Sequence, residues 1–270
     1  MGKYIYEYPH PAVTTDCVVF GFDGKELKVL LIERGIEPYK GMWAFPGGFM
    51  RMDETAEQCA VRELKEETGM EVRYLKQLGT FSGVNRDPRE RVVTIAFYTL
   101  AQHAEVRGGD DASKARWFTI EEVPQLAFDH DYILRQAMQS LRRDIHFEPV
   151  GFGLLNERFT IAELQRLYEA ILGIHFDRRN FYKKILQTGI LKEVEEPQMS
   201  KPSYFGRHKE MKKMSINALF GEPDDNNIVC ENGISCDFTH PTIGRPGKLY
   251  EFNEEGYNQM KESGTFRIEF

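Results

Sequence analysis

The stretch from Gly48 to Met70 reads GFMRMDETAEQCAVRELKEETGM, and it decides the fold of the first half of the 270-residue sequence. It predicts a helix from about Thr55 to Thr68, because Thr55 and Gln58 match a capping box and Gly69 supplies a stop signal. With about 100° between successive residues, small and acidic side chains share one face of this helix. That face carries Ala56, Cys59, Ala60, Glu63 and Glu67, with Glu66 beside it. Carboxylates therefore occupy positions that the periodicity assigns to the domain interior.

Two of these carboxylates, Glu63 and Glu67, are like charges four residues apart. Such a pair repels by some tenths of a kcal/mol at the surface and by more when it is desolvated, so a counter-cation is expected. Clustered carboxylate oxygens suit Mg²⁺, which keeps several waters and bridges to substrate phosphates. The alternative is a solvated acidic helix face. That alternative explains the charges, but it does not explain why Gly48, Arg62 and Gly69 stand in register with them.

The pattern Gly48-x5-Glu54-x7-Arg62-Glu63-Leu64-Lys65-Glu66-Glu67-Thr68-Gly69-Met70 resembles the Nudix box at every defined position. In that family the strand-loop-helix binds Mg²⁺ or Mn²⁺ and cleaves a diphosphate linked to another moiety. The resemblance implies that the Gly48 carbonyl and the carboxylates of Glu63, Glu66 and Glu67 are metal ligands. It also implies that Arg62 and Glu54 form the ion pair that orients them. An intact box that has lost turnover stays an alternative.

The general base is left open, because the family recruits it from different places. Glu66 or Glu67 can serve, and so can Glu121 or Glu122 after Trp117-Phe118. The latter two are also explained as the acidic N-terminal turn of a helix before Pro124.

The flanking sequence predicts an α/β Nudix fold with a mixed sheet sandwiched by helices. A hairpin is expected from Val13–Phe20 and Leu27–Ile32 around the Asp23-Gly24 turn. The segment from Trp43 to Gly48 leads to the helix, and further strands are expected at Lys76–Ser82, Val92–Leu100 and Ala115–Phe118. A helix at about Tyr132–Arg143 ends this half. The order of elements extends the Nudix resemblance over about residues 10 to 145, and the domain is assigned to residues 1–147.

Two loop segments indicate the substrate. Arg86-Asp87-Pro88-Arg89-x-Arg91 and Gly109-Asp110-Asp111-Ala112 resemble the ADP-ribose pyrophosphatase-like branch of the family. Arginines bind diphosphates through bidentate hydrogen bonds, so Arg86, Arg89 and Arg91 are candidate substrate-binding residues. The same arginines are alternatively surface charges. His130, in a segment that also resembles the family, is interpreted as a packed or capping histidine in preference to a catalyst.

The second half, residues 148–270, predicts an α+β winged helix-turn-helix domain. A capping box at Thr160 and Glu163 opens a helix to Leu172, Gly173 ends it, and Asp177 caps a second helix to about Gln187. Strands at Ile190–Val194 and Lys248–Phe252 are expected to pair as a wing, with an insertion at about 197–243 between them. From Ile174 to Lys213, ten Lys or Arg stand against five acids in a chain whose net charge is -7.

This half resembles the winged-helix domain of Nudix-related transcription regulators. The resemblance rests on Phe159-Thr-x3-Leu164, Asp177-Arg-Arg-Asn-Phe181 and Gly244-Arg-Pro-Gly-Lys-Leu-Tyr250. Members of that group sense ADP-ribose, related nucleotides or a pentose such as arabinose, and the appended domain binds operator DNA. The candidate residues for contacting duplex DNA are Arg178, Arg179, Asn180, Lys183 and Lys184. A solvated helix in a dimerisation or substrate-covering domain is the alternative.

Here the intact box favours an enzyme, and the long insertion in the wing departs from ordinary regulators. The sequence therefore predicts a divalent-metal-dependent hydrolase that cleaves ADP-ribose to AMP and ribose 5-phosphate. The other hypothesis is a regulator that senses ADP-ribose or arabinose, and a chain with both functions is compatible with each. A homodimer is expected, because two-fold assemblies are the commonest oligomers and the family resemblance points the same way.

The remaining composition excludes a membrane protein, since no run approaches the roughly 20 apolar residues that a spanning helix needs. The start carries no apolar signal core, and the cysteines at 17, 59, 230 and 236 are scattered, so a cytoplasmic protein with reduced thiols is expected. Cys230, Cys236 and His240, with His208, are an alternative zinc site. Their spacing is unlike that of common structural zinc sites.

Overall fold

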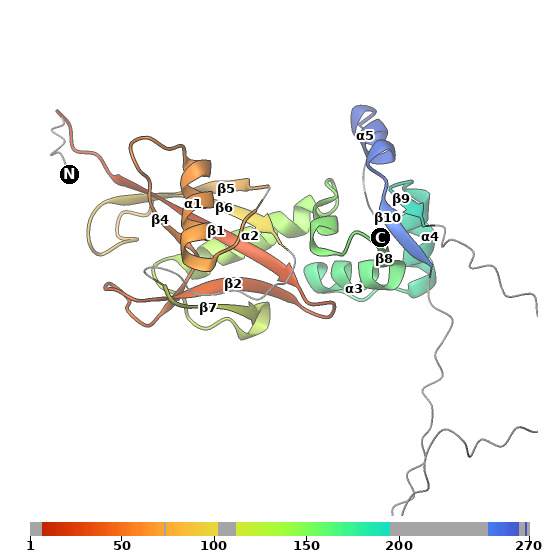
Figure 1. The fold of residues 1–270 in the computed structure, drawn as a ribbon, viewed down its shortest axis with the longest axis horizontal. Coiled ribbons are helices and arrows are strands. Elements are labelled where there is room, and N and C mark those ends of the chain that lie inside the picture. The colour runs from red at the N-terminus through yellow and green to blue at the C-terminus, as the bar shows by residue number, and fades with distance from the viewer. Residues whose placement is uncertain (1–6, 73, 102–111, 195–247, 265–267, 269–270) are drawn as a thin grey trace, which may run out of the picture. The chain divides into compact units, whose positions relative to one another are not determined.

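The computed structural model describes residues 7–72, 74–101, 112–194, 248–264 and 268 (Figure 1). Several sequence features lie outside this part of the chain. They are the Gly109–Asp111 segment, the insertion at 197–243, and the alternative zinc residues His208, Cys230, Cys236 and His240. In the described ranges no helix is both long and apolar enough to cross a membrane.

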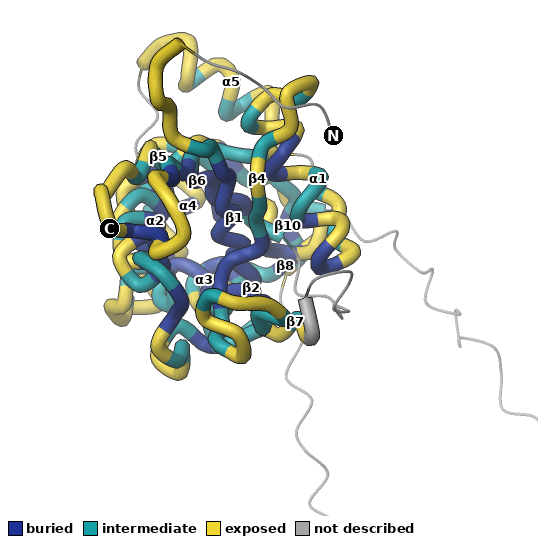
Figure 2. Tube along the Cα trace, turned by 90° about the vertical axis from the view of Figure 1, so that its left-hand side faces the viewer, coloured by how far each residue is buried: buried dark blue, intermediate teal, exposed yellow. Residues whose placement is uncertain are grey.

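The first half folds around a mixed sheet of seven strands whose centre is β1 (Ala12–Phe22). This strand pairs in parallel with β6 (Val92–Leu100) and antiparallel with β2 (Leu27–Arg34) and β4 (Gly47–Phe49). The sheet is completed by β3 (Trp43–Ala44) and β7 (Ala112–Thr119) beside β2, and by β5 (Lys76–Phe81) beside β6. Figure 2 shows β1 buried along most of its length. The predicted hairpin and mixed sheet are confirmed.

Both faces of the sheet are covered, and the alternation along β1 shows how. Val18, Phe20 and Phe22 belong to the apolar cluster that includes α2 (His130–Asp144), whereas Cys17 and Val19 pack with Leu64 of α1 (Ala56–Thr68). Successive side chains of a strand point to opposite faces, so the two helices cover opposite faces of the sheet. A strand buried on both faces is a near-continuous apolar run, as Cys17 to Phe20 is.

The caps of α1 fall where the sequence places them. The Thr55 hydroxyl accepts from the Gln58 backbone N–H, and the Gln58 side chain accepts from the Thr55 N–H. Gly69 ends the helix in the left-handed region at a φ of 72°. Helix α2 begins two residues before the predicted Tyr132, and the 3-10 helix η1 (Ile120–Glu122) occupies the loop that carries Glu121 and Glu122.

The second half has the predicted helix-turn-helix. Helix α3 (Ile161–Leu172) begins with the capping box of Thr160 and Glu163, and the Asp177 side chain caps α4 (Arg178–Gln187). Strands β9 (Leu191–Glu193) and β10 (Leu249–Phe252) pair antiparallel as the wing, and a third strand, β8 (Phe159–Thr160), joins the other side of β10. The sequence did not predict β8, the 3-10 helix η2 (Val150–Leu154) or α5 (Glu254–Glu262).

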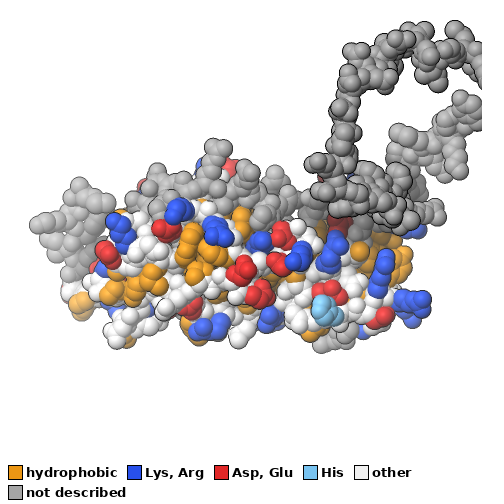
Figure 3. Space-filling view, turned by 90° about the horizontal axis from the view of Figure 1, so that it is seen from below, with side chains coloured by type: hydrophobic (Ala, Val, Ile, Leu, Met, Phe, Trp, Pro, Cys, Tyr) orange, Lys and Arg blue, Asp and Glu red, His pale blue; other side chains and the backbone are white. Residues whose placement is uncertain are grey.

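The two halves share apolar packing. One cluster of buried side chains contains residues of α2 together with residues of α3 and α4, among them Leu141, Leu167 and Ile185. The Arg142 guanidinium of α2 donates from Nε to the carbonyl of Ile171 in α3 at 2.9 Å. On the face seen in Figure 3, basic and acidic side chains are interleaved. The described surface in that view therefore shows no single-sign charge patch.

Candidate functional site

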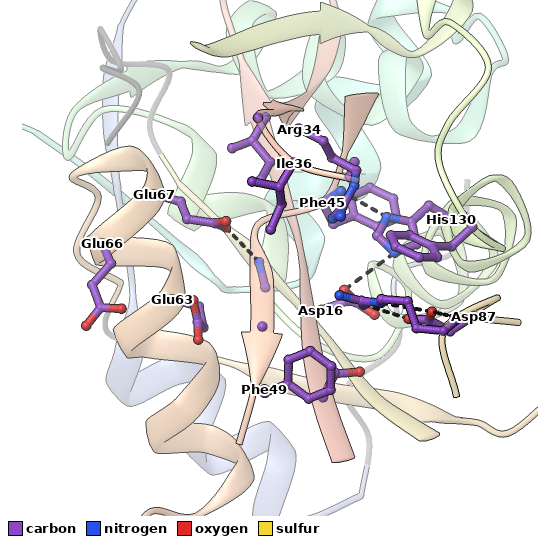
Figure 4. A pocket seen from close by; sticks show the side chains of 18 of the residues that line it. Asp16, Arg34, Ile36, Phe45, Phe49, Glu63, Glu66, Glu67, Asp87 and His130 are labelled. Atoms are coloured by element: carbon purple, nitrogen blue, oxygen red, sulfur yellow. Dashed lines mark hydrogen bonds and ion pairs between the residues drawn. The ribbon is translucent and has the colours of Figure 1, made fainter. Parts of the chain in front are cut away.

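A cavity of about 660 Å³ lies against β1, β2, β4 and the inner face of α1. Figure 4 shows its two sides: Glu63, Glu66 and Glu67 on α1 lie to one side of β4, and Asp16, Asp87 and His130 lie to the other. The cavity is thus walled by the predicted acidic helix face on one side and by a second polar group on the other.

Glu67 is the most deeply placed of the three helix carboxylates. Only 8% of the residue is exposed, and its Oε2 accepts a hydrogen bond from the Gly47 backbone N–H at 2.8 Å. Burial raises the pKa of Glu67 to about 8, and the nearby carboxylates of Glu63 and Asp16 add to this rise while the Gly47 N–H opposes it. A carboxylate that resists ionisation in this way is stabilised by a cation beside it. The like-charge argument from the sequence therefore holds at this position.

Arg62 links the carboxylates of the helix. Its Nε and Nη2 donate to the two oxygens of Glu54 at 2.9 and 2.6 Å, as the bidentate ion pair expected from the sequence. Its Nη1 also donates to Glu63 Oε1 at 2.7 Å and to Glu66 Oε2 at 2.9 Å. Burial raises the pKa of Glu63, while its contact with Arg62 opposes that rise. The Arg62 guanidinium thus joins three carboxylates, and Glu66 also pairs with Arg51 at 3.5 Å.

A glycine at position 48 allows the Glu63 carboxylate to approach the backbone of β4. A Cβ at this position would stand 2.4 Å from Glu63 Oε1, so the absence of a side chain lets the carboxylate lie against the backbone. The donor set of one carbonyl and three carboxylates fits a hard divalent cation. Among the described residues no three acidic, His or Cys side chains are already gathered as a metal site. Arg62 instead pairs with Glu63 and Glu66, and the Gly47 N–H with Glu67, so an ion bound here would replace some of these contacts.

The three arginines predicted to bind substrate have different surroundings. Arg86 is buried, and its Nε and Nη2 donate to Asp129 at 3.1 and 2.8 Å. Arg89 pairs with Asp87 through Nε and Nη2 at 3.0 and 2.7 Å, and both arginines line the cavity. Arg91 is not in the lining, and it donates to the carbonyls of Ser82 and Gly83 at 3.0 Å each. Its contacts therefore fix the turn and do not place it beside a ligand.

Arg34, at the end of β2, is a cavity residue that sequence reasoning missed. Its Nε donates to the Pro38 carbonyl at 2.8 Å, and its guanidinium lies 4.7 Å from the centre of the Phe128 ring. Among the described residues no carboxylate forms an ion pair with it, and burial together with the charge of Arg89 lowers its pKa. A half-buried cation held in this way is suited to an anion. The available signal was an arginine that directly follows a buried strand and faces the loop before the box.

His130 and Asp16 form the wall opposite α1. The Nδ1 of His130 accepts from the Phe45 backbone N–H at 3.0 Å, and its ring stacks on Phe45 with centres 5.0 Å apart. Burial lowers the pKa of His130, so the neutral ring carries its proton on Nε2, 3.5 Å from Asp16 Oδ1. His130 is therefore packed, as interpreted from the sequence. Sequence reasoning did not select Asp16, which lies inside a strand that reads as core.

The structure distinguishes between the two pairs of residues that are alternative general bases. Glu66 and Glu67 line the cavity, whereas Glu121 and Glu122 are exposed on η1 and are absent from the lining. The geometry therefore favours the helix carboxylates over the η1 pair.

A second candidate surface lies on α4. Phe181 and Ile185 are buried beneath the helix, and Arg178, Arg179, Asn180 and Lys183 are exposed, while Lys184 is half-buried. None of its four cationic side chains forms an ion pair within the described ranges. Cations that are not neutralised by the protein are available to phosphates.

Comparison with known families agrees with both surfaces. The model described as the NUDIX domain matches residues 10–137, and the model described as the NrtR DNA-binding winged helix domain matches residues 151–205. The chain is 33% identical over 199 residues to the ADPR responsive transcriptional repressor NtrR of Acinetobacter baylyi, covering 72% of this chain and 80% of that protein. It is 42% identical over 132 residues to the ADP-ribose pyrophosphatase of Methanocaldococcus jannaschii, covering 49% and 76%.

A solved structure matches nearly the whole chain. The crystal structure of Shewanella oneidensis NrtR complexed with a 27mer DNA has 25% sequence identity and a TM-score of 0.61, and it covers 91% of this chain and 95% of that one. The chain is thus similar to a DNA-binding regulator over both halves and to a pyrophosphatase over the first half.

Proposed function

Because the chain belongs to the Nudix family, in the group whose members carry an NrtR-type winged helix, we propose that it is a DNA-binding regulator that senses ADP-ribose and retains the ability to cleave it. The observation that carries this proposal is the pairing, in one chain, of the carboxylate-lined cavity with the uncompensated cations of α4. The similarity to the repressor over both halves supports the regulator, and the 42% identity to the pyrophosphatase supports the hydrolase. We further propose a cytoplasmic homodimer with its domain boundary at residues 147 and 148.

In the cavity, Gly48, Glu63, Glu66 and Glu67 are proposed to hold Mg²⁺ or Mn²⁺. Such ions neutralise phosphate charge and lower the pKa of the attacking water when they are bound. Arg62 keeps Glu54, Glu63 and Glu66 in position through its fork of hydrogen bonds. Arg34 presents its guanidinium to the pyrophosphate, and Glu66 or Glu67 accepts the proton of the water.

We expect ADP-ribose to be hydrolysed to AMP and ribose 5-phosphate with Mg²⁺ or Mn²⁺ present. The reason is that every defined position of the box is present, Arg62 pairs with Glu54, and the three helix carboxylates line one cavity. The measurement is product formation by chromatography over a panel of nucleotide sugars, dinucleotides and oxidised nucleoside triphosphates, with and without EDTA. No turnover on the whole panel would contradict the hydrolase and leave the sensor to be tested separately.

The sensor is tested on DNA. Titrating ADP-ribose into a complex of the Glu67→Gln variant with DNA from the gene's own upstream region should release the DNA without hydrolysis interfering. Moving an equilibrium from 1:99 to 99:1 requires a ligand to prefer one state by about 5.5 kcal/mol, so release needs a clear difference in ADP-ribose affinity between free and DNA-bound protein. L-Arabinose is the parallel titration. Release by arabinose alone would reassign the effector, and no effect of either would contradict the sensor.

A further inference from the structure

Asp16 lies in the cavity wall across β4 from the carboxylates proposed to bind metal. It belongs to β1, where it pairs in register with Gly47, and 7% of the residue is exposed. Figure 4 places it across β4 from Glu63 and Glu67, beside His130 and Asp87. It thus borders the half of the cavity that faces away from α1.

The Asp16 carboxylate lacks the hydrogen bonds that a buried group of this kind normally has. Its nearest cation is Arg86, whose Nη2 stands 3.5 Å from Oδ2, and the His130 Nε2 stands 3.5 Å from Oδ1. Within the described part of the chain Oδ2 has no hydrogen-bond partner. Buried polar groups are satisfied in the large majority of cases, and leaving one unsatisfied costs about 1–3 kcal/mol. Asp16 is therefore a buried carboxylate with unfilled acceptor capacity in the wall of the cavity.

Neither neighbour is free to close the gap. Arg86 is fixed by its two hydrogen bonds to Asp129, and His130 is fixed by the Phe45 N–H and by stacking on the Phe45 ring. The 3.5 Å separations are thus built into the surrounding packing. Oδ2 itself is buried, but a tenth of the Asp16 side chain is exposed and the residue lines the cavity, so a ligand atom can approach the carboxylate from there.

The charge of the wall restricts what that ligand atom can be. A phosphate oxygen would meet the negative charge of Asp16 here, because the guanidiniums of this wall are already bound to carboxylates, Arg86 to Asp129 and Arg89 to Asp87. A neutral hydroxyl donor suits a carboxylate oxygen, and charge-assisted hydrogen bonds of this type are among the stronger ones. We propose that Asp16 is a specificity-determining residue that accepts a hydrogen bond from a ribose hydroxyl of the ligand.

This assignment rests on the proposed function, and it orients the ligand within the cavity. The pyrophosphate lies toward Arg34 and the carboxylates of α1, and a pentose lies toward Asp16. The Asp16 contact selects ribose over deoxyribose. A deoxyribose ligand lacks the hydroxyl, so the buried Asp16 carboxylate would stay without a hydrogen-bond donor when that ligand binds.

The test compares ligands that each lack one donor. ADP-ribose is compared with its 2′-deoxyadenosine analogue, with its terminal 2-deoxyribose analogue, and with the inosine analogue that lacks the base amine. Binding is measured by calorimetry in EDTA, which stops hydrolysis whichever metal the protein uses. Wild-type protein should lose about 10- to 100-fold in affinity for one of the deoxyribose ligands, as expected for one hydrogen bond to a charged group. Asp16→Ala should bind that ligand and ADP-ribose equally well.

Matched variants separate recognition from general damage. Asp87→Ala removes a carboxylate of the same wall whose oxygens are already bound to Arg89, so it should weaken all ligands alike and keep the wild-type preference. Asp16→Asn keeps the shape of the side chain and should show an intermediate preference for ribose over deoxyribose. This variant replaces Asp16→Ala in the test if the alanine variant does not fold. The melting temperature of each variant reports folding.

The outcomes are distinct. If Asp16→Ala keeps the full preference for ribose, or if the inosine ligand is the only one affected by Asp16, the ribose assignment is overturned. If Asp87→Ala also loses the preference for ribose, the preference is set by the shape of the wall. That result would overturn the ribose assignment as well. Failure of wild-type protein to bind ADP-ribose contradicts the proposed function instead.

Discussion

Replacing Glu67 with glutamine is expected to lower the rate of ADP-ribose hydrolysis by at least about 100-fold, the usual contribution of a positioned acid-base group. Glutamine keeps the size of the side chain, and its amide oxygen can still accept from the Gly47 N–H, which Glu67 now binds at 2.8 Å. It removes the negative charge that the proposed metal site and the proton transfer both use. The measurement is the rate of AMP formation at saturating Mg²⁺.

The same variant should not be less stable in metal-free buffer. Burial raises the pKa of Glu67 in the folded protein to about 8, whereas an unfolded glutamate has its ordinary pKa of 4.5. The native state then binds more protons than the unfolded state, so the free energy of unfolding falls as the pH rises between these values. Glutamine removes this fall. The melting temperature of Glu67→Gln relative to wild type should therefore rise from about pH 5 to about pH 8 and level off above it.

A matched control is Glu57→Gln, which changes an exposed carboxylate in the first turn of the same helix. It should keep wild-type activity. If Glu67→Gln melts well below wild type at every pH while Glu57→Gln does not, Glu67 is a structural residue and its catalytic assignment fails.

The winged helix is expected to bind duplex DNA through α4 with an affinity that falls steeply with salt. Each phosphate contact by Lys or Arg contributes roughly 0.9 to the slope of log affinity against log salt. A dimer that makes about six such contacts should lose about three decades of affinity between 50 and 200 mM salt. Light scattering at micromolar concentration should give the mass of the dimer. The affinity is measured by fluorescence anisotropy on the gene's upstream DNA.

Variants on α4 distinguish the contribution of charge to DNA binding from the contribution of base recognition. Neutralising Arg178 and Lys183 should flatten the salt slope and weaken binding on all sequences, whereas Asn180→Ala should act mainly on sequence preference. Lys114→Gln is the control, because this exposed lysine of β7 already pairs with Glu33 at 2.9 Å and lies off the helix. Absence of binding at 50 mM salt would assign the domain to dimerisation or to covering the cavity. A monomer mass would require fewer contacts and a shallower slope.

Features set by local sequence were predictable. The limits of α1 follow from Thr55, Gln58 and Gly69, whose caps act within one turn of the helix. The ion pair of Arg62 with Glu54 was implied by the resemblance to the Nudix box, and the structure has it at 2.6 Å. The α3 and α4 caps are local in the same sense.

The opposite wall of the cavity depends on contacts between distant segments. Asp16 faces the cavity only because β1 pairs with β4. Arg86 donates its hydrogen bonds to Asp129, which lies 43 residues further along the chain. Neither contact leaves a periodic pattern or a motif in the sequence from which it could be predicted. The two residues of β8 have too little length for a strand pattern, and Gly256 inside α5 disfavours a helix. Tertiary packing decides these elements.

The close approach of Glu63 to Gly48 has an evolutionary consequence. A single added methyl group at this position would meet the end of a flexible side chain and not the backbone, so it would push the Glu63 carboxylate aside and leave the strand in place. Arg34 and Asp16 would be untouched by that change. For the hydrolase and regulator proposed above, one codon change at Gly48 would thus alter the proposed metal site while leaving the rest of the pocket and α4 in place.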